Sequence, residues 1–426
     1  MQVTRTDQSP TKVTLAIEAS TADLAPIKKH VLSHFIDQVK VPGFREGRAP
    51  LNMVEKHISP ERLNSEFLEH AINEFFQQAV RAEKLRPVGQ PDVQLKKFVP
   101  YTTLGFEATL EVIGAVKVAN YKAIKLAKPQ VSVSAADVNS VLKSLQERAA
   151  ERQEVKRAAK DGDEVVIDFA GKDQADEPVA GAEGKDYPLI LGSKSFIPGF
   201  EENVIGLKAG ESKDFLITFP KDYGVAALQS KKVTFALTAK KVSELVEPKL
   251  DDAFAAKAGP FKALAELKAD IKKQALSEKQ YQADQQYQNE LIKKVADKSS
   301  VDVPAGLIEE QVEFMEQEEK RNLTYRGQTW TEHLKSEGIT QEQHRERQRP
   351  DAEARVKAGL VLSEISELEG LDVTPEEVDI RIQILKAQYQ DPAMQAELDK
   401  PENRRDVAAR MLTEKTIQKL VEYSSK

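Results

Sequence analysis

The spacing of apolar residues changes along this chain and limits what it can fold into. Val13, Leu15 and Ile17 alternate with polar neighbours, which predicts a half-buried strand. Residues 161–245 combine glycines, aromatic residues and further alternating stretches, whereas the residues after 247 keep the spacing of amphipathic helices. At 426 residues the chain is longer than one hydrophobic core usually supports, so we expect roughly two to three domains.

The first segment predicts a domain that mixes strands and helices. Helical spacing follows the first strand, and residues 51–85 predict two further helices, because Ser59 can cap a helix and Pro60 can begin one. Alternation returns at residues 101–116. We therefore expect an α+β domain over residues 1–113.

A charged helix over residues 134–157, with a thin apolar stripe and Ser134 as its cap, is typical of a connector between domains. Beyond the β-rich segment, Gly and Pro separate candidate helices at residues 260–295, 304–323, 329–337, 341–368, 375–389 and 402–423. We therefore predict a multidomain α+β protein with an α+β domain at 1–113, a connector at 114–149 that belongs to the helical body, a β-rich inserted domain at 150–245 and an all-helical body at 246–426.

Composition excludes several classes of protein. The absence of cysteine excludes disulfides, thiolate catalysis and cysteine metal sites, and it fits a reducing compartment. A net charge of −7 argues against broad binding to phosphate backbones, although one basic loop is enough to touch RNA locally. No apolar stretch has the length of a signal peptide or a membrane span, so we expect a cytoplasmic protein with no membrane partner.

Two further motifs bear on ligands. The phosphate-binding pattern G-x-x-x-x-G-K-[ST] does not occur, so we expect no nucleotide cycle and no cofactor. His30 and His34 are four residues apart, a spacing that can hold a metal ion on a helix, but the sequence offers no obvious third ligand. We therefore interpret them as a solvated pair and predict no metal site.

The string GFREGRAP lies between two predicted helices and should form an exposed loop. Gly43 and Gly47 stand at its bends and Pro50 closes it. Phe44 offers an apolar anchor, and Arg45 and Arg48 offer two guanidinium groups. This combination suits a surface made of both RNA and protein. An ordinary polar turn with one exposed phenylalanine is the alternative, and the residues alone leave both open.

This string resembles the ribosome-binding signature of trigger factors, Gly-Phe-Arg-x-Gly-x-x-Pro, and the order of the predicted domains is similar to theirs along the whole chain. The resemblance implies an ATP-independent chaperone that docks on the large ribosomal subunit at the exit tunnel through Phe44, Arg45 and Arg48. It also implies that nascent and unfolded polypeptides are the clients. Homodimerisation off the ribosome stays open.

The inserted domain resembles prolyl isomerases of the FKBP type. The resemblance lies in VIDFAG at residues 166–171, in LG at 191–192, in FIPGFE at 196–201 and in GLKAGE at 206–211. Carried over residue by residue, it implies an apolar bowl lined by Phe169, Tyr187, Phe196, Ile197, Phe200, Phe219, Tyr223 and Phe235. For Phe219 and Phe235, packing in the domain core is an equally good interpretation; Phe200 and Tyr223 are stronger candidates.

Two departures from the FKBP pattern concern activity. Val179 and Ala180 stand where the family usually has an aromatic residue followed by an acid, and Gly224 follows Tyr223 where trigger factors often have histidine. The bowl then lacks a polar group and one aromatic wall. We therefore expect isomerase activity to be weakened or absent.

The helical body implies a client-binding surface only through the resemblance, which also implies two protruding arms. Apolar stripes at helical spacing, such as the one containing Met315, usually face a core. The candidates for client contact are flexible methionines, aromatic residues and an isoleucine: Met315, Tyr325, Trp330, Ile384, Tyr389 and Met394. Two other hypotheses stay open: that the protein is mainly a prolyl isomerase, or that it is a non-catalytic adaptor anchored to the ribosome.

Overall fold

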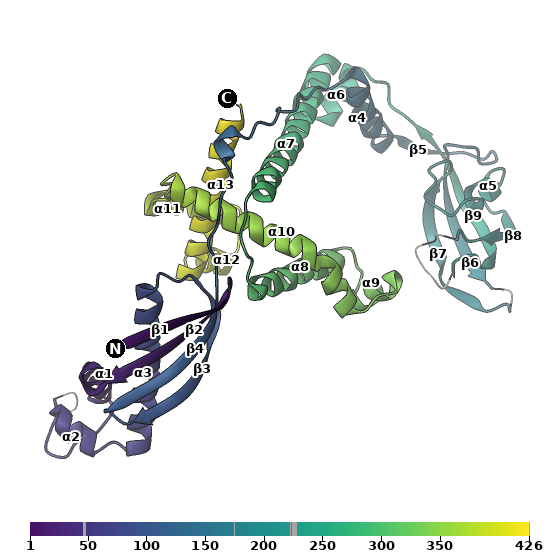
Figure 1. The fold of residues 1–426 in the computed structure, drawn as a ribbon. Coiled ribbons are helices and arrows are strands. Elements are labelled where there is room, and N and C mark those ends of the chain that lie inside the picture. The colour runs from purple at the N-terminus through teal and green to yellow at the C-terminus, as the bar shows by residue number, and fades with distance from the viewer. Residues whose placement is uncertain (46–47, 174, 222, 224–227, 426) are drawn as a thin grey trace. The chain divides into compact units, whose positions relative to one another are not determined.

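The computed structural model describes residues 1–425 except 46–47, 174, 222 and 224–227. The chain divides into two compact units. One unit comprises residues 1–127, 287–330 and 339–426, and the other comprises residues 128–286 and 331–338. Figure 1 labels the helices and strands of both units.

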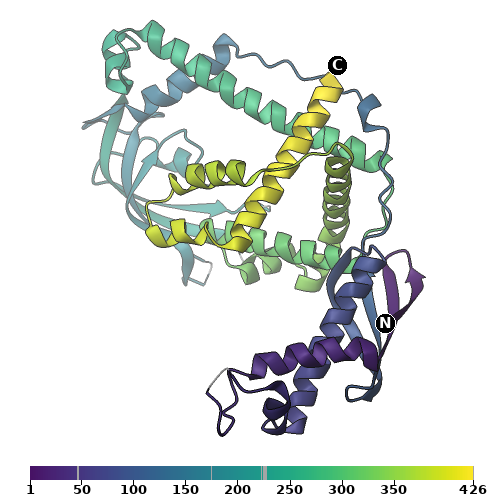
Figure 2. The same cartoon turned by 90° about the vertical axis from the view of Figure 1, so that its left-hand side faces the viewer.

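A four-stranded antiparallel sheet with the strand order β1-β2-β4-β3 forms the first domain. Its elements are β1 (Gln2–Ser9), β2 (Lys12–Ser20), α1 (Thr21–Phe35), α2 (Leu51–Lys56), α3 (Pro60–Ala82), β3 (Pro87–Val99) and β4 (Thr103–Val112). Helices α1 and α3 cover one face of the sheet (Figure 2), where Ile17 of β2 pairs with Phe106 of β4 and both are buried. The outward face of β2 and β4 carries polar residues, so the alternation in the sequence follows this burial.

The predicted elements of this domain are confirmed. The alternating residues form β2 and β4, and the break between the two predicted helices falls at Ser59, whose hydroxyl accepts a hydrogen bond from the Arg62 N–H at 3.3 Å. Pro60 is the first residue of α3. Sequence periodicity does not reveal β1 and β3, because nearly all of their side chains are exposed and a strand without a buried face shows no alternation.

The connector helix α4 (Ala135–Arg148) begins as predicted but ends earlier than predicted. Ser134 and Asp137 form a reciprocal capping box, in which the Asp137 N–H donates to the Ser134 hydroxyl at 3.2 Å. The expectation that the helix continues to residue 157 is wrong. Residues Glu151–Glu154 form strand β5, because their backbone pairs with the edge of β9, and this tertiary pairing outweighs the helical propensity of the charged sequence.

The β-rich domain is a five-stranded antiparallel sheet. Its elements are β5, β6 (Glu164–Lys172), β7 (Pro178–Ile190), α5 (Phe200–Val204), β8 (Ser212–Thr218) and β9 (Lys232–Val246). The strand order is β5-β9-β6-β7, and β8 also pairs with β9. The short helix α5 packs on the inner face, where Phe200, Ile167 and Leu237 are buried in one core.

Helices make up the rest of the chain: α6 (Asp252–Ala258), α7 (Leu264–Lys298), α8 (Ala305–Tyr325), α9 (Trp330–Glu337), α10 (Gln341–Leu368), α11 (Pro375–Lys386), α12 (Pro392–Glu397) and α13 (Pro401–Ser425). The six predicted helices are confirmed; α10 has the predicted bounds, and the other five have shifted ends. The sequence analysis missed α6 and α12, because seven and six residues are too few for an amphipathic period to show.

A carboxylate joins three distant segments of the helical body. Glu369, at the end of α10, accepts hydrogen bonds from the hydroxyls of Tyr121 at 2.6 Å and Tyr423 at 2.8 Å. The Lys122 ammonium pairs with it at 2.8 Å. These donors, Lys122 first, lower the pKa of Glu369 from 4.5 to about 2. The segment that follows the first domain is therefore bound to both α10 and α13.

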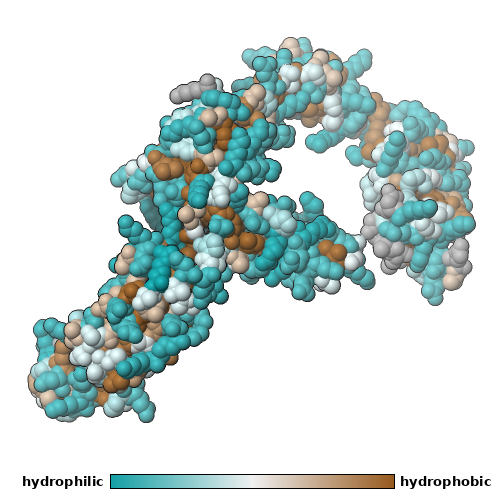
Figure 3. All heavy atoms as spheres, in the orientation of Figure 1, coloured by the Kyte–Doolittle hydropathy of each residue, from teal (hydrophilic) through white to brown (hydrophobic). Residues whose placement is uncertain are grey.

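The face of the molecule drawn in Figure 3 is mostly hydrophilic. On the face drawn in Figure 3, hydrophobic residues form separate patches among charged and polar side chains. Within the described part of the chain, no helix is both long and apolar enough to cross a membrane.

Replacing Glu369 by glutamine should destabilise the helical body in a pH-dependent way. At pH 7, loss of the charge shared by three donors should lower the free energy of unfolding by about 1.5–3 kcal/mol. Because the pKa of Glu369 is lowered to about 2, its contribution is complete above the unfolded-state value of 4.5 and is lost as the pH falls towards 2. Thermal unfolding should therefore show midpoints for Glu369→Gln and the parent protein that converge on acidification.

The matched control is Glu310→Gln, which changes an exposed glutamate of α8. It should leave the midpoint unchanged at every pH. A gap between Glu369→Gln and the parent that stayed constant from neutral to acid pH would contradict the assigned role of the carboxylate.

Candidate functional site

The loop between α1 and α2 is anchored in the core at both ends and exposed between them. Val41 and Ala49 are buried in the core of the first domain. Phe44 is 44% exposed, and Arg45 and Arg48 are exposed as well. Because the buried ends fix where the loop leaves and re-enters the domain, they hold its tip out in solvent.

Glycine and proline shape this loop. Gly43 has a φ of +86°, in the left-handed region where a residue with a Cβ is strained. The Phe44 N–H then donates to the Val41 carbonyl at 3.2 Å. Pro50 is the residue before the first turn of α2, with an extended backbone. The predicted bend at Gly47 lies outside the described residues.

The two arginines of the tip are available for a partner. The Arg48 N–H donates to the Arg45 carbonyl at 3.0 Å. Among the described residues, neither guanidinium group forms an ion pair or a side-chain hydrogen bond. The described part of the loop therefore presents one apolar ring and two positive charges on one short segment.

A second candidate site is an apolar bowl of about 430 Å³ in the β-rich domain. The structure brings together in its wall all the bowl residues predicted from the sequence: Phe169 on β6, Tyr187 on β7, Phe196 and Ile197 before α5, Phe200 in α5, Phe219 and Tyr223 after β8, and Phe235 on β9. Six neighbours that the sequence analysis missed also line it: Gly181, Ala182, Ser195, Pro198, Pro220 and Leu228. Three of these six, Ser195, Pro198 and Pro220, are directly adjacent in sequence to predicted bowl residues, and this adjacency is the only signal that pointed to them.

Burial separates the floor of the bowl from its rim. Phe200, Phe219 and Phe235 are all buried, so they form the floor and belong to the domain core at the same time. Tyr187 is 44% exposed and Tyr223 is half-buried, so they form the rim. For Phe219 and Phe235, the two interpretations left open by the sequence are therefore compatible.

Contacts between aromatic rings hold the bowl in shape. The ring centre of Phe196 lies 4.5 Å from that of Phe200, and the ring of Phe169 lies 5.6 Å from Phe200 in an edge-to-face arrangement. Gly184 on β7 leaves room for this ring, because a Cβ there would lie 2.5 Å from Cε1 of Phe169. The glycine is therefore part of the site, although it makes no contact with a ligand itself.

A buried carboxylate positions the segment that carries Phe196. Glu201 accepts hydrogen bonds from the backbone N–H groups of Gly192 at 2.8 Å, Lys194 at 3.2 Å, Ser195 at 3.0 Å and Phe196 at 3.3 Å. Burial would raise the pKa of Glu201, but these donors outweigh it and the pKa is lowered. The charge therefore orders one wall of the bowl.

The structure describes only part of the two departures from the FKBP pattern. Val179 is half-buried and packs against the domain core, but it does not line the bowl. Gly224 and the side chain of Ala180 lie outside the description. Among the described residues, the lining of the bowl contains no carboxylate and no cation.

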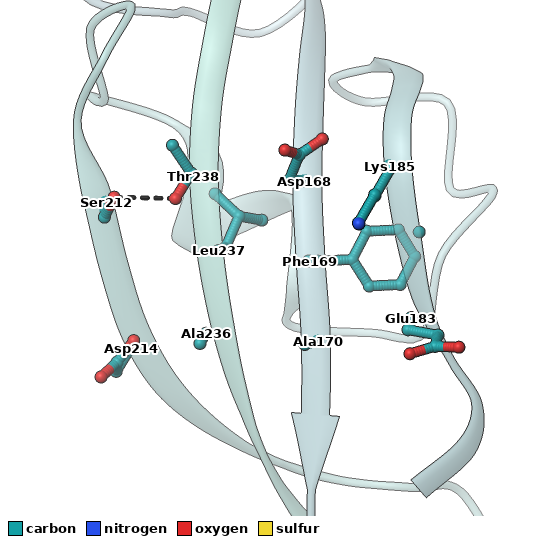
Figure 4. Close-up of a pocket in the computed structure, with 11 residues that line it drawn as sticks. Asp168, Phe169, Ala170, Glu183, Lys185, Ser212, Asp214, Ala236, Leu237 and Thr238 are labelled. Carbon is teal, nitrogen blue, oxygen red and sulfur yellow. Dashed lines mark hydrogen bonds between the residues drawn. The ribbon is translucent and has the colours of Figure 1, made fainter. Parts of the chain in front are cut away.

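Another hollow, of about 570 Å³, lies on the outer face of the same sheet (Figure 4). Asp168, Ala236 and Asp214 line it from outward positions on β6, β9 and β8. The hydroxyls of Ser212 and Thr238 lie 2.8 Å apart in it. Its lining includes four charged residues and one aromatic residue, Phe169, whereas seven aromatic residues line the bowl, so the aromatic bowl is the stronger candidate for a prolyl ring.

The predicted client-contact residues fall into two groups. Tyr325 at the end of α8 is 90% exposed, and Ile384, Tyr389 and Met394 are exposed in and between α11 and α12. These four side chains are free to contact a client.

Met315 and Trp330 are less accessible. Met315 is half-buried and packs against Ile308 and Val312. The ring of Trp330 lies 4.9 Å from that of His344, and it is also half-buried. Their spacing in the sequence therefore reflects packing within the helical body.

Comparison with known families covers almost the entire chain. Residues 1–145 match the model of the bacterial trigger factor protein, and residues 263–422 match the model of its C-terminus. Residues 155–242, which contain the bowl, match the model of the FKBP-type peptidyl-prolyl cis-trans isomerase. The chain is also 34% identical over 423 residues to the trigger factor of Carboxydothermus hydrogenoformans, with 99% of each protein covered. The chain belongs to the trigger factor family.

Other relatives agree with this membership. The trigger factor of Halothermothrix orenii is 33% identical over 90% of this chain and 89% of its own length. A solved structure described as "Promiscuous Substrate Recognition in Folding and Assembly Activities of the Trigger Factor Chaperone" aligns over 99% of both chains with a TM-score of 0.51 and 18% identity, so it supports the fold. The predicted family, the multidomain α+β fold and the assignment as a trigger factor chaperone with an FKBP-type domain are confirmed. Membership of the family implies binding to ribosomes and nascent chains.

Gly184→Ala should distort the bowl of this trigger factor. The added Cβ would overlap the ring of Phe169, so we expect the domain to lose about 1–3 kcal/mol of stability and to bind proline-containing peptides more weakly. Chemical denaturation and calorimetric titration with such a peptide measure the two effects. Glu183→Ala, at the adjacent outward-facing position of β7, is the control and should change neither. Peptide binding that is as tight in Gly184→Ala as in the parent would contradict this account.

Proposed function

We propose that this trigger factor docks on the large ribosomal subunit beside the exit tunnel through Phe44, Arg45 and Arg48. The observation that carries the proposal is the exposed tip between two buried anchors, Val41 and Ala49. A tip held in this way loses little conformational freedom when it binds. Docking there would place the working protein in the cytoplasm.

The chemistry of the tip suits a surface of RNA and protein. Guanidinium groups bind phosphate or carboxylate oxygens through paired hydrogen bonds, and an exposed phenylalanine fills an apolar pocket. Because the whole chain carries a net charge of −7, attraction to RNA is confined to this segment. The interaction should therefore weaken as salt rises, but its apolar part should persist.

The variant Phe44→Ala/Arg45→Ala/Arg48→Ala should lose docking. Co-sedimentation with large ribosomal subunits at fixed salt should pellet the parent protein and leave this variant in solution. The matched control is Leu95→Ala/Lys96→Ala/Lys97→Ala, which removes one exposed apolar residue and two exposed cations from β3 of the same domain. The control should pellet like the parent. Equal sedimentation of both triple variants would show that this loop is not the anchor.

We also propose that the bowl binds prolyl peptides but turns them over slowly. Isomerisation needs no nucleophile, because an apolar site that excludes water lowers the barrier of the twisted imide. The aromatic floor provides such a site. Because Val179 and Ala180 replace the aromatic–acid pair, the protein lacks a carboxylate that would accept a hydrogen bond from an N–H group of the substrate.

Restoring the aromatic–acid pair should therefore raise activity. In an assay of prolyl isomerisation in a short peptide, Val179→Phe/Ala180→Asp should increase kcat/KM by about tenfold or more, the size of one charge-assisted hydrogen bond. Val179→Phe/Ala180→Asn, which restores the ring but not the charge, is the control and should gain less. A parent protein that already turns over peptides as fast as the double variant would overturn this proposal.

For client binding, we propose that Tyr325, Ile384, Tyr389 and Met394 contribute more than Met315 and Trp330. The first four are exposed, and an exposed apolar side chain can pack on an unfolded chain without first leaving a core. Homodimerisation off the ribosome is also part of the proposal. We assign docking to residues 1–113, isomerisation to 150–245 and client binding to 246–426, with 114–149 joining the helical body.

A further inference from the structure

Three histidines of the first domain lie together on the helical face of the sheet. His30 and His34 occupy successive turns of α1, and His70 lies in the middle of α3, which packs beside α1. His70 therefore supplies a third imidazole beside His30 and His34, which the sequence alone did not reveal. Half of the six histidines of the chain are in this cluster.

The distances between these rings fit a shared metal ion. Their centres are 4.4 Å apart for His30 and His34, 5.9 Å for His30 and His70, and 5.4 Å for His34 and His70. A zinc ion bound at about 2.1 Å by three imidazole nitrogens in a tetrahedral arrangement places the ring centres about 5 Å apart. The backbone of two helices thus already sets the spacing that three ligands need.

The rings are not yet oriented as ligands. Their planes make angles of 62° to 79° with one another. Their ring nitrogens do not all lie within 4.8 Å of one another, as the ligand atoms of Glu319, His333 and His344 do. His30 and His34 are exposed, so they can rotate about their side-chain bonds without breaking a core. Binding would therefore need rotation of two exposed rings and of the half-buried ring of His70.

A carboxylate near two of these rings offers a fourth ligand. Glu74, one helical turn after His70, lines the same surface hollow as His30 and His70. Its partner is the amide of Gln78 at 2.8 Å, which can be given up at little cost. Asp23 also lines the hollow, but its carboxylate is held by the N-terminal ammonium and by Ser20. Glu74 or a water molecule would then take the fourth position.

We propose that His30, His34 and His70 form a binding site for a divalent transition-metal cation such as Zn²⁺. Such cations prefer imidazole nitrogen as a ligand. Three imidazoles, with a carboxylate or a water molecule in the fourth position, give a complete tetrahedral shell. The bound ion joins α1 to α3 and stabilises the first domain, because the unfolded chain does not hold the three rings together.

Calorimetric titration of ZnCl₂ into the full-length protein, freed of metal by a chelator, tests the proposal. The parent should bind one equivalent, and His34→Ala and His70→Ala should each lower the affinity at least about tenfold. Because His34 is exposed, its replacement should leave the fold intact, which circular dichroism checks. Zinc should also protect these three histidines from diethyl pyrocarbonate, as read by mass spectrometry.

The control variant replaces the other three histidines, His57, His333 and His344, by glutamine. It should retain the zinc equivalent and the protection of His30, His34 and His70. Unchanged affinity in His34→Ala and His70→Ala, loss of binding in the control variant, or no binding by the parent would each overturn the proposal.

Discussion

The carboxylate of Glu369 is the interaction through which the helical body holds together segments far apart in sequence. It binds Tyr121 and Lys122, which follow the first domain, and Tyr423 near the end of the chain. The isolated pairing of Lys117 with Ser300 secures the same segment to the end of α7. The body is therefore assembled from residues on both sides of the inserted domain, which explains why that domain can interrupt the sequence without dividing the fold.

The same use of charge recurs in the helix pair α8 and α10. Glu316 is buried, yet the Arg345 guanidinium at 2.5 Å, the Gln341 amide at 2.7 Å and the Lys320 ammonium bind its oxygens. Burial would raise the pKa of Glu316, but Lys320 and Arg345 lower it. A buried carboxylate without such partners would be strongly destabilising. Paired charges inside the body and single exposed apolar residues such as Tyr325 outside it fit a surface that holds unfolded chains weakly.

The two sites of this trigger factor differ in how much of them local sequence could predict. The proposed docking loop, residues 43–50, is a continuous string, so its Gly43 bend and the proline that precedes α2 follow from the residues themselves. The bowl draws on β6, β7, β9 and the segments around α5 and β8, and only the family resemblance brought its eight residues together in advance. Glu201 and Gly184 were missed, because one acts through the backbone of another segment and the other by leaving space for Phe169.

Sequence alone determined the features that arise within a few residues: the capped starts of α3 and α4, the buried faces of β2 and β4, and the exposure of the docking loop. Tertiary structure decided the rest. It turned the expected end of the connector helix into β5 by pairing it with β9, and it left Met315 half-buried while exposing Tyr325. It also placed His70 beside His30 and His34. The physical reason is that capping and periodicity act over one or two turns of chain, whereas strand pairing and side-chain packing depend on which distant segments meet.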